Sequence, residues 1–310
     1  MITEETVFIL GAGASRPYGY PTGKELRYKI CNNLIEDLIS DSLIQKKTSF
    51  YDNIVEFTRT FAKSNNKSID LFLTRNPNFE FFGKFSITYY ILKSEEQSNN
   101  PEELKNDEFD WYSELYDRLT KELLKSNDYE YLERTFSFII FNYDRALENY
   151  LFESFKNSFT DINPTKIADE LKKIPINHVY GQVVTLPWQG FNQFLSYRDE
   201  NWKYNVSNFS KNIKVIYNQR NTPCLHDIMI SIKAAKRIFF LGFGYANENM
   251  EVLNIVDNIN ANQKIYGTAY GFTKKEILKI KSYFSKTHKI DNPDLVIEDC
   301  DCLTLLRNYL

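Results

Sequence analysis

Apolar residues gather in short continuous runs near both ends of the chain. Residues 6–10 (TVFIL) and 136–141 (FSFIIF) are rich in β-branched and aromatic side chains and have the length of strands. Similar runs follow at 237–241 (RIFFL), 264–266 (KIY) and 295–297 (LVI). Continuous rather than alternating apolar character is typical of strands that are buried on both faces. We therefore expect these runs to form one buried sheet.

Helical periods separate these runs. The first helix begins near residues 22–24 and has an apolar residue at every fourth position: Leu26, Ile30, Leu34 and Leu38. A second begins at Asp144, and a third over 273–284 opens with a capping box of Thr273 and Glu276. Alternating strands and helices predict an α/β fold, a Rossmann-like parallel sheet with helices on both faces.

The middle of the chain has a different pattern. Apolar residues at helical spacing recur within a charged stretch: Trp111, Leu115, Leu119 and Leu123. The run 85–92 (FSITYYIL) fits either a strand or a buried helix. We therefore predict a Rossmann-like core formed by residues 1–40 and 132–310, and a mostly helical insertion module over 41–131.

Glycine is scarce, so its positions are informative. The 310 residues include 11 glycines, of which four lie within residues 11–23 (GAGASRPYGYPTG) and only Gly83 lies between 24 and 180. Residues 11–23 join the first strand to a helix, where backbone N–H groups favour a phosphate. A tight turn without a ligand is the alternative, because Arg16 stands at the third glycine position of the G-x-G-x-x-G fingerprint. A second strand-to-GxG pattern occurs at 241–244.

Polar residues at other strand ends are candidates for chemistry. Asn142 follows a buried strand and offers both a donor and an acceptor. Asp144 could cap the next helix, and that is the more common role for such a residue. His178 is one of three histidines and precedes a glycine, although a single histidine is more often structural. The loop 298–303 (EDCDCL) either borders a bound purine ring or only ends a strand.

Composition excludes several classes of protein. A hydrophobic share of 43% and a charged share of 25% indicate a folded chain, and a net charge of −3 gives no general attraction for nucleic acid. No apolar run approaches the roughly 20 residues that span a bilayer, and residues 1–10 lack the basic start of a signal peptide. The four cysteines form no CxxC pair, so we expect neither a zinc site nor disulfides, and a reducing, cytoplasmic location.

Taken in order, these segments resemble the sirtuin-like family of NAD-using proteins. GAGAS and GYPTG, within 11–23, resemble the sirtuin GAG(I/A)S and G(I/L)P loop. FNYD (141–144) resembles the Asn-x-Asp motif, and HVYG (178–181) resembles the element with the catalytic histidine. LGFGYANEN (241–249) resembles the later glycine loop. The resemblance covers roughly residues 5–35 and 134–305.

Two departures from the deacylating sirtuins point to one branch of the family. Residues 182–223 contain no cysteine, whereas those enzymes carry a four-cysteine zinc module after the histidine. The sirtuin GIPDFR segment reads GYPTGKEL here, with Glu25 and Leu26 opening the helix. Both features resemble bacterial anti-phage defence proteins that lack the zinc module and hydrolyse NAD.

The resemblance implies an NAD hydrolase without a metal. It would cleave the nicotinamide–ribose bond and release nicotinamide and ADP-ribose. Asn142 would orient the ribose or the attacking water, Asp144 would support it, and His178 would accept a proton. The amides of residues 12–14 would hold the pyrophosphate, with a hydroxyl from Ser15. The cofactor-binding residues that the resemblance implies are Gly11, Ala12, Gly13, Ala14, Ser15, Pro21, Thr22, Gly242, Phe243, Gly244 and Cys302.

Three alternatives stay open at this point. The chain could be a non-catalytic sensor of NAD or ADP-ribose, a zinc-independent NAD-dependent deacylase, or an accessory subunit of a larger assembly. As a defence effector that depletes NAD it would need restraint, so we expect a homo-oligomer and, from the family branch, a HerA-like ATPase or another defence-system partner. We expect no membrane and no direct nucleic-acid binding.

Overall fold

A computed structural model of the chain describes residues 2, 4–98, 109–120, 135–190, 192–215, 223–288 and 294–310. Its centre is a six-stranded parallel sheet with the order β3-β2-β1-β4-β5-β6. The strands are β1 (Thr6–Leu10), β2 (Phe136–Ile140), β3 (Ile176–His178), β4 (Arg237–Leu241), β5 (Lys264–Thr268) and β6 (Leu295–Glu298). All five predicted runs are strands of this sheet.

Strand β1 lies in the middle of the sheet and is buried along its whole length. Its Phe8 stacks between Phe138 of β2 and Phe239 of β4, with ring centroids 5.3 Å and 5.5 Å away. The chain runs outward from β1 to β2 and β3, and then returns to the other side of β1 to form β4. The order of the strands therefore reverses between β1 and β4, and ligands bind at such a switch point in open α/β sheets.

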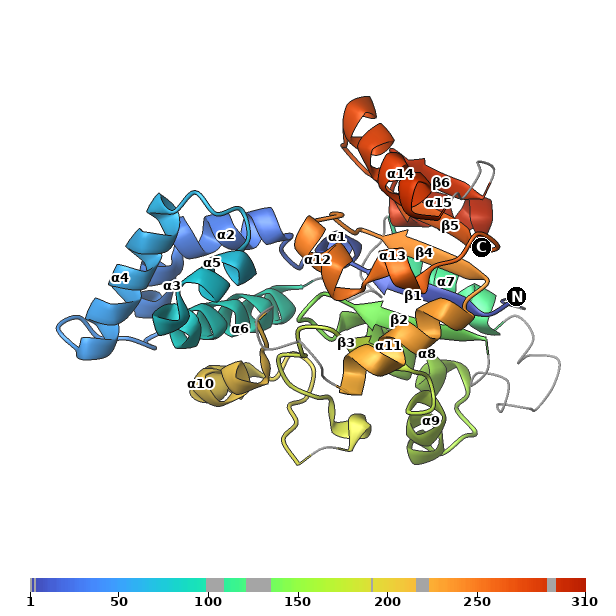
Figure 1. Cartoon of the computed structure of the whole chain (residues 1–310). Helices are drawn as coiled ribbons and strands as arrows, with labels where there is room; N and C mark the ends of the chain where they lie inside the picture. Colours follow the sequence, from blue (N-terminus) through green and yellow to red (C-terminus); the bar gives the residue numbers. More distant parts are fainter. Residues whose placement is uncertain are drawn as a thin grey trace.

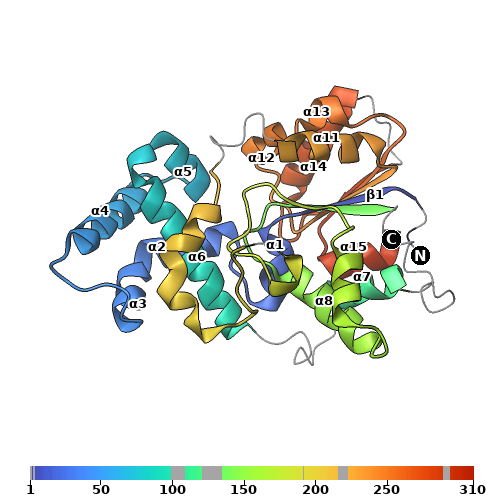
Figure 2. The same cartoon turned by 90° about the horizontal axis from the view of Figure 1, so that it is seen from below.

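Helices cover both faces of the sheet, as predicted (Figure 2). One face carries α11 (Pro223–Ala234), α12 (Asn247–Val252), α13 (Ile255–Asn258) and α14 (Lys274–His288). The other carries α7 (Trp111–Thr120), α8 (Ala146–Ser158) and α15 (Cys302–Tyr309), with α9 (Pro164–Leu171) beside α8. The predicted capping box of α14 is present, because the Thr273 N–H donates to the Glu276 carboxylate and the Glu276 N–H donates to the Thr273 hydroxyl. The parallel sheet with helices on both faces confirms the predicted α/β fold class.

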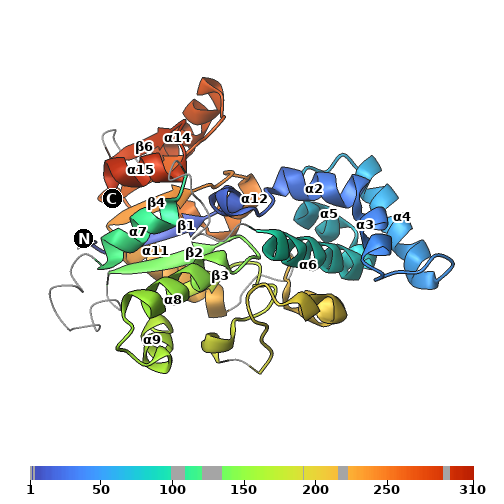
Figure 3. The ribbon, with the colours of Figure 1, turned by 180° about the vertical axis from the view of Figure 1, so that it is seen from behind.

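A separate group of helices lies beyond the carboxyl ends of the strands (Figures 1 and 3). This helical lobe consists of α2 (Gly23–Asn32), α3 (Leu34–Ser40), α4 (Ser49–Lys63), α5 (Ile69–Arg75) and α6 (Glu80–Gln97). The ambiguous run 85–92 is part of α6, which is buried on most sides and therefore shows little helical period. Helix α10 (Val206–Phe209) packs against α6.

Helix α7 belongs in space to the sheet and not to the helical lobe, since it packs against α8 and α15. The division into a core of 1–40 with 132–310 and a module of 41–131 stays a prediction, and residues 121–131 of that module lie outside the described ranges. Short 3₁₀ helices occupy Arg16–Tyr18, Pro77–Phe79, Pro187–Gln189, Glu200–Asn205 and Ser210–Asn212. Within the described ranges, no helix combines the length and the apolar character that crossing a membrane requires.

Candidate functional site

Two glycine loops meet at the switch point of the sheet. The loop after β1 includes the short helix α1 (Ala12–Ser15), and the loop after β4 begins at Gly242. A Cβ on Gly11 would lie 2.5 Å from the Gly242 carbonyl oxygen, and a Cβ on Gly242 would lie 1.9 Å from the Ala14 nitrogen. Gly242 also has a φ of +55°, which disfavours a side chain. These glycines are therefore required for the two backbones to approach each other.

Two of the amides that were expected to bind a pyrophosphate already donate hydrogen bonds within the protein. The Gly13 N–H donates to the Gly242 carbonyl at 3.0 Å, and the Ala14 N–H donates to the Gly11 carbonyl at 2.9 Å. These two amides are thus hydrogen-bonded within the protein, and their role at a pyrophosphate stays a prediction. Gly244 differs from Gly11, Gly13 and Gly242 of the same two loops, because it is exposed and a Cβ there would meet nothing within 4 Å.

A polar cluster lies beside these loops, at the ends of β1 and β2. The Asn142 side-chain amide donates to the Ser15 hydroxyl at 2.7 Å, and the Ser15 hydroxyl is hydrogen-bonded to the Asp144 carboxylate. Asp144 also accepts the Ala146 N–H at 3.1 Å, at the start of α8. Three predicted residues from two separate segments are thus brought together in one hydrogen-bonded chain.

Two groups of this cluster have unusual properties: one carboxyl has a raised pKa, and one buried amide oxygen lacks a hydrogen-bond donor in the described part of the chain. Burial raises the pKa of the Asp144 carboxyl to about 6, because desolvation of the charged form outweighs the hydrogen bonds from Ser15 and Ala146. The Oδ1 atom of Asn142 is buried and has no hydrogen-bond partner in the described part of the chain. A buried acceptor without a donor is costly, so a bound ligand that supplies the donor would stabilise it.

His178 ends the edge strand β3 and joins the cluster through its ring. Its Nδ1 lies 3.0 Å from the Asn142 carbonyl oxygen, and its Nε2 lies 2.6 Å from Oε1 of Glu148 on α8. Burial on its own would lower the pKa of His178, but the charge and the hydrogen bond of Glu148 raise it above the ordinary value. Both ring nitrogens therefore face oxygen atoms of the protein.

Sequence reasoning missed Glu148, which is only 1% exposed. Gln182 also donates to its Oε1 atom, at 2.9 Å. Glu148 lies in the first turn of α8, four residues after Asp144, and is close enough for its charge to affect the Asp144 carboxyl. That spacing was the available signal.

A buried ion pair next to this cluster was missed as well. The Arg145 guanidinium contacts the Glu95 carboxylate of α6 through two hydrogen bonds, Nη2–Oε1 at 2.7 Å and Nε–Oε2 at 2.9 Å. Its remaining N–H groups donate to the backbone carbonyls of Thr185, Leu195 and Ser196. Because the partners come from distant parts of the sequence, no local pattern could have revealed the pair. It connects the helical lobe to the residue that follows Asp144.

Pro21 and Thr22 lie at the start of α2. Pro21 is buried, and the Thr22 hydroxyl accepts the Glu25 N–H while the Glu25 carboxylate accepts the Thr22 N–H. The side chain of Thr22 is therefore used to cap the helix. A contact of either residue with a ligand stays a prediction.

Phe243 and Cys302 flank the second glycine loop. Phe243 is buried against Phe141, with ring centroids 5.1 Å apart. Cys302 opens α15 close to Gly242, whose N–H donates to the Thr268 hydroxyl, and burial raises the pKa of the Cys302 thiol. Cys302 is thereby placed next to the loop, as a protonated thiol.

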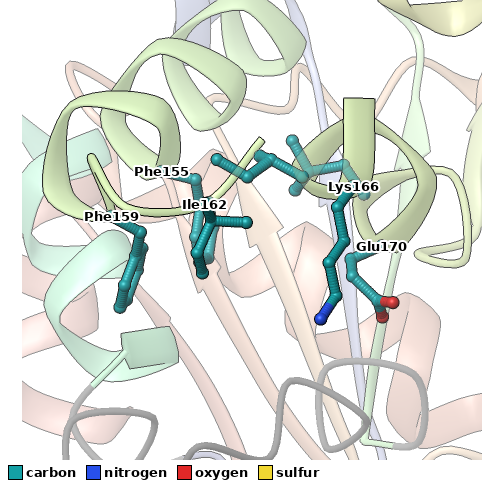
Figure 4. Close-up of a pocket in the computed structure, with 7 residues that line it drawn as sticks. Phe155, Phe159, Ile162, Lys166 and Glu170 are labelled. Atoms are coloured by element: carbon teal, nitrogen blue, oxygen red, sulfur yellow. The ribbon is translucent and has the colours of Figure 1, made fainter. Parts of the chain in front are cut away.

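The cavities found elsewhere do not contribute to this cluster. One lies between α8 and α9, where Lys166 and Glu170 extend beside Phe155, Phe159 and Ile162 (Figure 4). It holds about 10 Å³, the space of a single water molecule. A second, of about 510 Å³, lies between the helical lobe and the segment that includes Lys203 and Tyr204. In the described ranges, no group of three or more His, Cys, Asp or Glu side chains is arranged to hold a metal.

No family model matches the sequence, and no curated protein is detectably similar to it. Among solved structures, the chain is similar to a crystal structure of Sir2 in complex with the inhibitor EX-527, 2′-O-acetyl-ADP-ribose and a deacetylated p53 peptide. The similarity covers 98% of this chain and 91% of that chain, with 13% sequence identity and a TM-score of 0.40. At this level of similarity, the function has to be inferred from the residues of this chain.

Proposed function

We propose that the chain is an NAD hydrolase that cleaves the nicotinamide–ribose bond and releases nicotinamide and ADP-ribose. The observation that best supports this is the state of Asn142. Its amide N–H is used by Ser15, whereas its buried Oδ1 has no partner in the described part of the chain. A ribose hydroxyl or a water molecule would supply the missing donor.

In the proposed reaction, the oxygen of a water molecule attacks C1′ of the nicotinamide ribose. The electron pair of the broken C–N bond goes to the nicotinamide ring nitrogen, so nicotinamide leaves as a neutral molecule. The water loses one proton, and NAD⁺ plus water thus gives nicotinamide, ADP-ribose and H⁺. Asn142 Oδ1 would hold the water or a ribose hydroxyl, and we assign the released proton to Asp144 by way of the Ser15 hydroxyl.

We place the nucleotide along the crevice between the loops after β1 and β4. Parallel α/β sheets bind ligands at this edge, where the order of the strands reverses. Ala12 is half-buried and Gly244 is exposed, with open space on the side where a Cβ would stand. These two positions leave backbone accessible to a phosphate or a sugar, whereas Gly13 and Ala14 would contribute by close contact only.

The test is incubation of the purified chain with NAD and chromatographic measurement of nicotinamide and ADP-ribose. We expect the two products in equal amounts, and we expect Asn142→Ala to abolish their formation. Asn308→Ala is the matched control, because Asn308 is exposed on α15 and lies outside the cluster. Binding of NAD without release of nicotinamide would instead support the non-catalytic sensor. Loss of an acyl group from a lysine peptide, dependent on NAD, would support the deacylase.

The role in the cell is proposed from the sequence resemblance. Hydrolysis of NAD would make the chain an effector of anti-phage defence, and unregulated NAD loss is toxic to the host. We therefore propose that a homo-oligomer or a HerA-like ATPase controls it. Size-exclusion mass measurement combined with the nicotinamide assay on the same fractions tests this.

A further inference from the structure

The ring of His178 is held between two acceptors, and the chemistry of each acceptor limits the state of the ring. A backbone carbonyl only accepts, so the Nδ1 atom that faces the Asn142 carbonyl at 3.0 Å must carry a hydrogen. The Nε2 atom lies 2.6 Å from Oε1 of Glu148, a short distance that is typical of a charge-assisted hydrogen bond.

The surroundings of the ring favour its charged form. Gln182 donates to the same Oε1 atom of Glu148, as expected for an ionised carboxylate that accepts two hydrogen bonds. The charged groups that face His178 are Glu148 from α8 and Asp144 from the loop after β2, and both are acidic. The side chains of His178 and Glu148 are 10% and 1% exposed, so solvent screens their attraction poorly.

We propose that Glu148 accepts the Nε2–H of His178 and holds the ring as an imidazolium, whose Nδ1–H fixes the backbone at Asn142, so that His178 is a positioning residue and not the proton acceptor. The His178 hydrogen bond to the Asn142 carbonyl sets the direction of the peptide that carries the Asn142 side chain. The consequence for catalysis rests on the proposed NAD hydrolysis, whereas the charge state of His178 does not.

The two roles of His178 predict opposite effects of pH. A proton acceptor works only when it is neutral, so the rate would rise as pH increases through the pKa of His178. A positioning imidazolium is present below that pKa, so the rate would fall as pH increases through it. The pKa of His178 lies above its ordinary value because of Glu148, which places the fall on the alkaline side of the profile.

The direct experiment is a pH titration of the full chain labelled with ¹⁵N-histidine. The chain has three histidines, and loss of one signal set in His178→Gln identifies His178. We expect both ring nitrogens of His178 to keep the protonated signals above pH 6.5, the ordinary midpoint. A His178 midpoint at or below 6.5 in the unmodified chain would overturn the proposal.

Glu148→Gln then tests the partner, because the glutamine amide can donate to Nε2 of a neutral ring and keeps the size of the side chain. We expect the His178 midpoint to shift to lower pH, and the alkaline fall of the NAD hydrolysis rate to shift with it. Glu153→Gln is the control, since Glu153 is on the same helix but pairs with Lys156 at the surface.

An unchanged midpoint in Glu148→Gln, or a wild-type rate that rises through the His178 midpoint, would show the proposal to be wrong. If the chain does not hydrolyse NAD, the titration still decides the charge state of His178, so the two failures are distinguishable.

Discussion

The Arg145 guanidinium and the Glu95 carboxylate form a buried, two-point ion pair that joins the helical lobe to the sheet. Arg145 directly follows Asp144 and precedes α8, so the pair lies next to the polar cluster. Glu95 comes from the last turns of α6 and also accepts the Arg198 N–H. The position of the lobe and the geometry of the cluster therefore depend on the same contact.

Removing one partner of this pair should be strongly destabilising. Glu95→Ala would leave the Arg145 charge buried and unpaired, which costs about 3–5 kcal/mol of the free energy of unfolding. Urea denaturation followed by circular dichroism measures this loss. Glu153→Ala breaks an exposed ion pair with Lys156 and should cost less than about 1 kcal/mol. Equal losses in the two variants would contradict the assignment.

Asn142→Ala should reduce the rate of NAD hydrolysis by about 10²-fold or more, because it removes a preorganised polar group from the proposed reaction centre. The fold should persist, since the removed side chain makes one hydrogen bond, to Ser15. Nicotinamide release and the melting temperature should be measured on the same preparation. A folded variant with the parental rate would refute the role of Asn142.

The acid side of the pH–rate profile should report Asp144. Its pKa is raised to about 6 by burial, and the carboxylate accepts a proton only when ionised. The rate should therefore rise as pH increases through about 6. Asp144→Asn cannot ionise and should lose this rise together with most of the activity. A profile that is flat between pH 5 and 7 in the parental chain would speak against Asp144 as the acceptor.

The two glycines of the loop after β4 should respond differently to alanine. Gly242→Ala places a Cβ 1.9 Å from the Ala14 nitrogen and is strained at a φ of +55°, so we expect a loss of about 1–3 kcal/mol or more. Gly244→Ala meets nothing within 4 Å, and its stability should change by less than about 0.5 kcal/mol. If Gly244 borders the nucleotide, the same variant should weaken NAD binding in calorimetry.

Much of the sheet could be predicted from the sequence, because a buried parallel strand is a continuous apolar run. Strand β3 is only three residues long and half-buried, so its own sequence carries little signal. Only the pattern at His178 indicates that a strand ends there. The run at Phe85 could not be assigned, since a helix that is buried on most sides loses its amphipathic period.

Site residues could be predicted from the sequence only where they follow or end a predicted strand. Asn142, Asp144 and His178 were found because each follows or ends a strand of the sheet. Glu148 carried only the weak signal of its spacing from Asp144, and the Arg145–Glu95 pair joins distant segments, so it leaves no local pattern. The hydrogen bond of the Gly13 N–H was hidden for a related reason, because its acceptor Gly242 lies far away in the sequence.

The close approach of Gly11 to Gly242 also has a consequence for how the chain can evolve. A side chain at either position would collide with the backbone of the other loop, so neither Gly11 nor Gly242 can be replaced unless the other loop moves. Although most of the chain lies between the two loops, a change of backbone in one loop has to be compatible with the glycine of the other. A chimaera that exchanges one loop with a homologue and keeps the other should therefore fold less well than one that exchanges both.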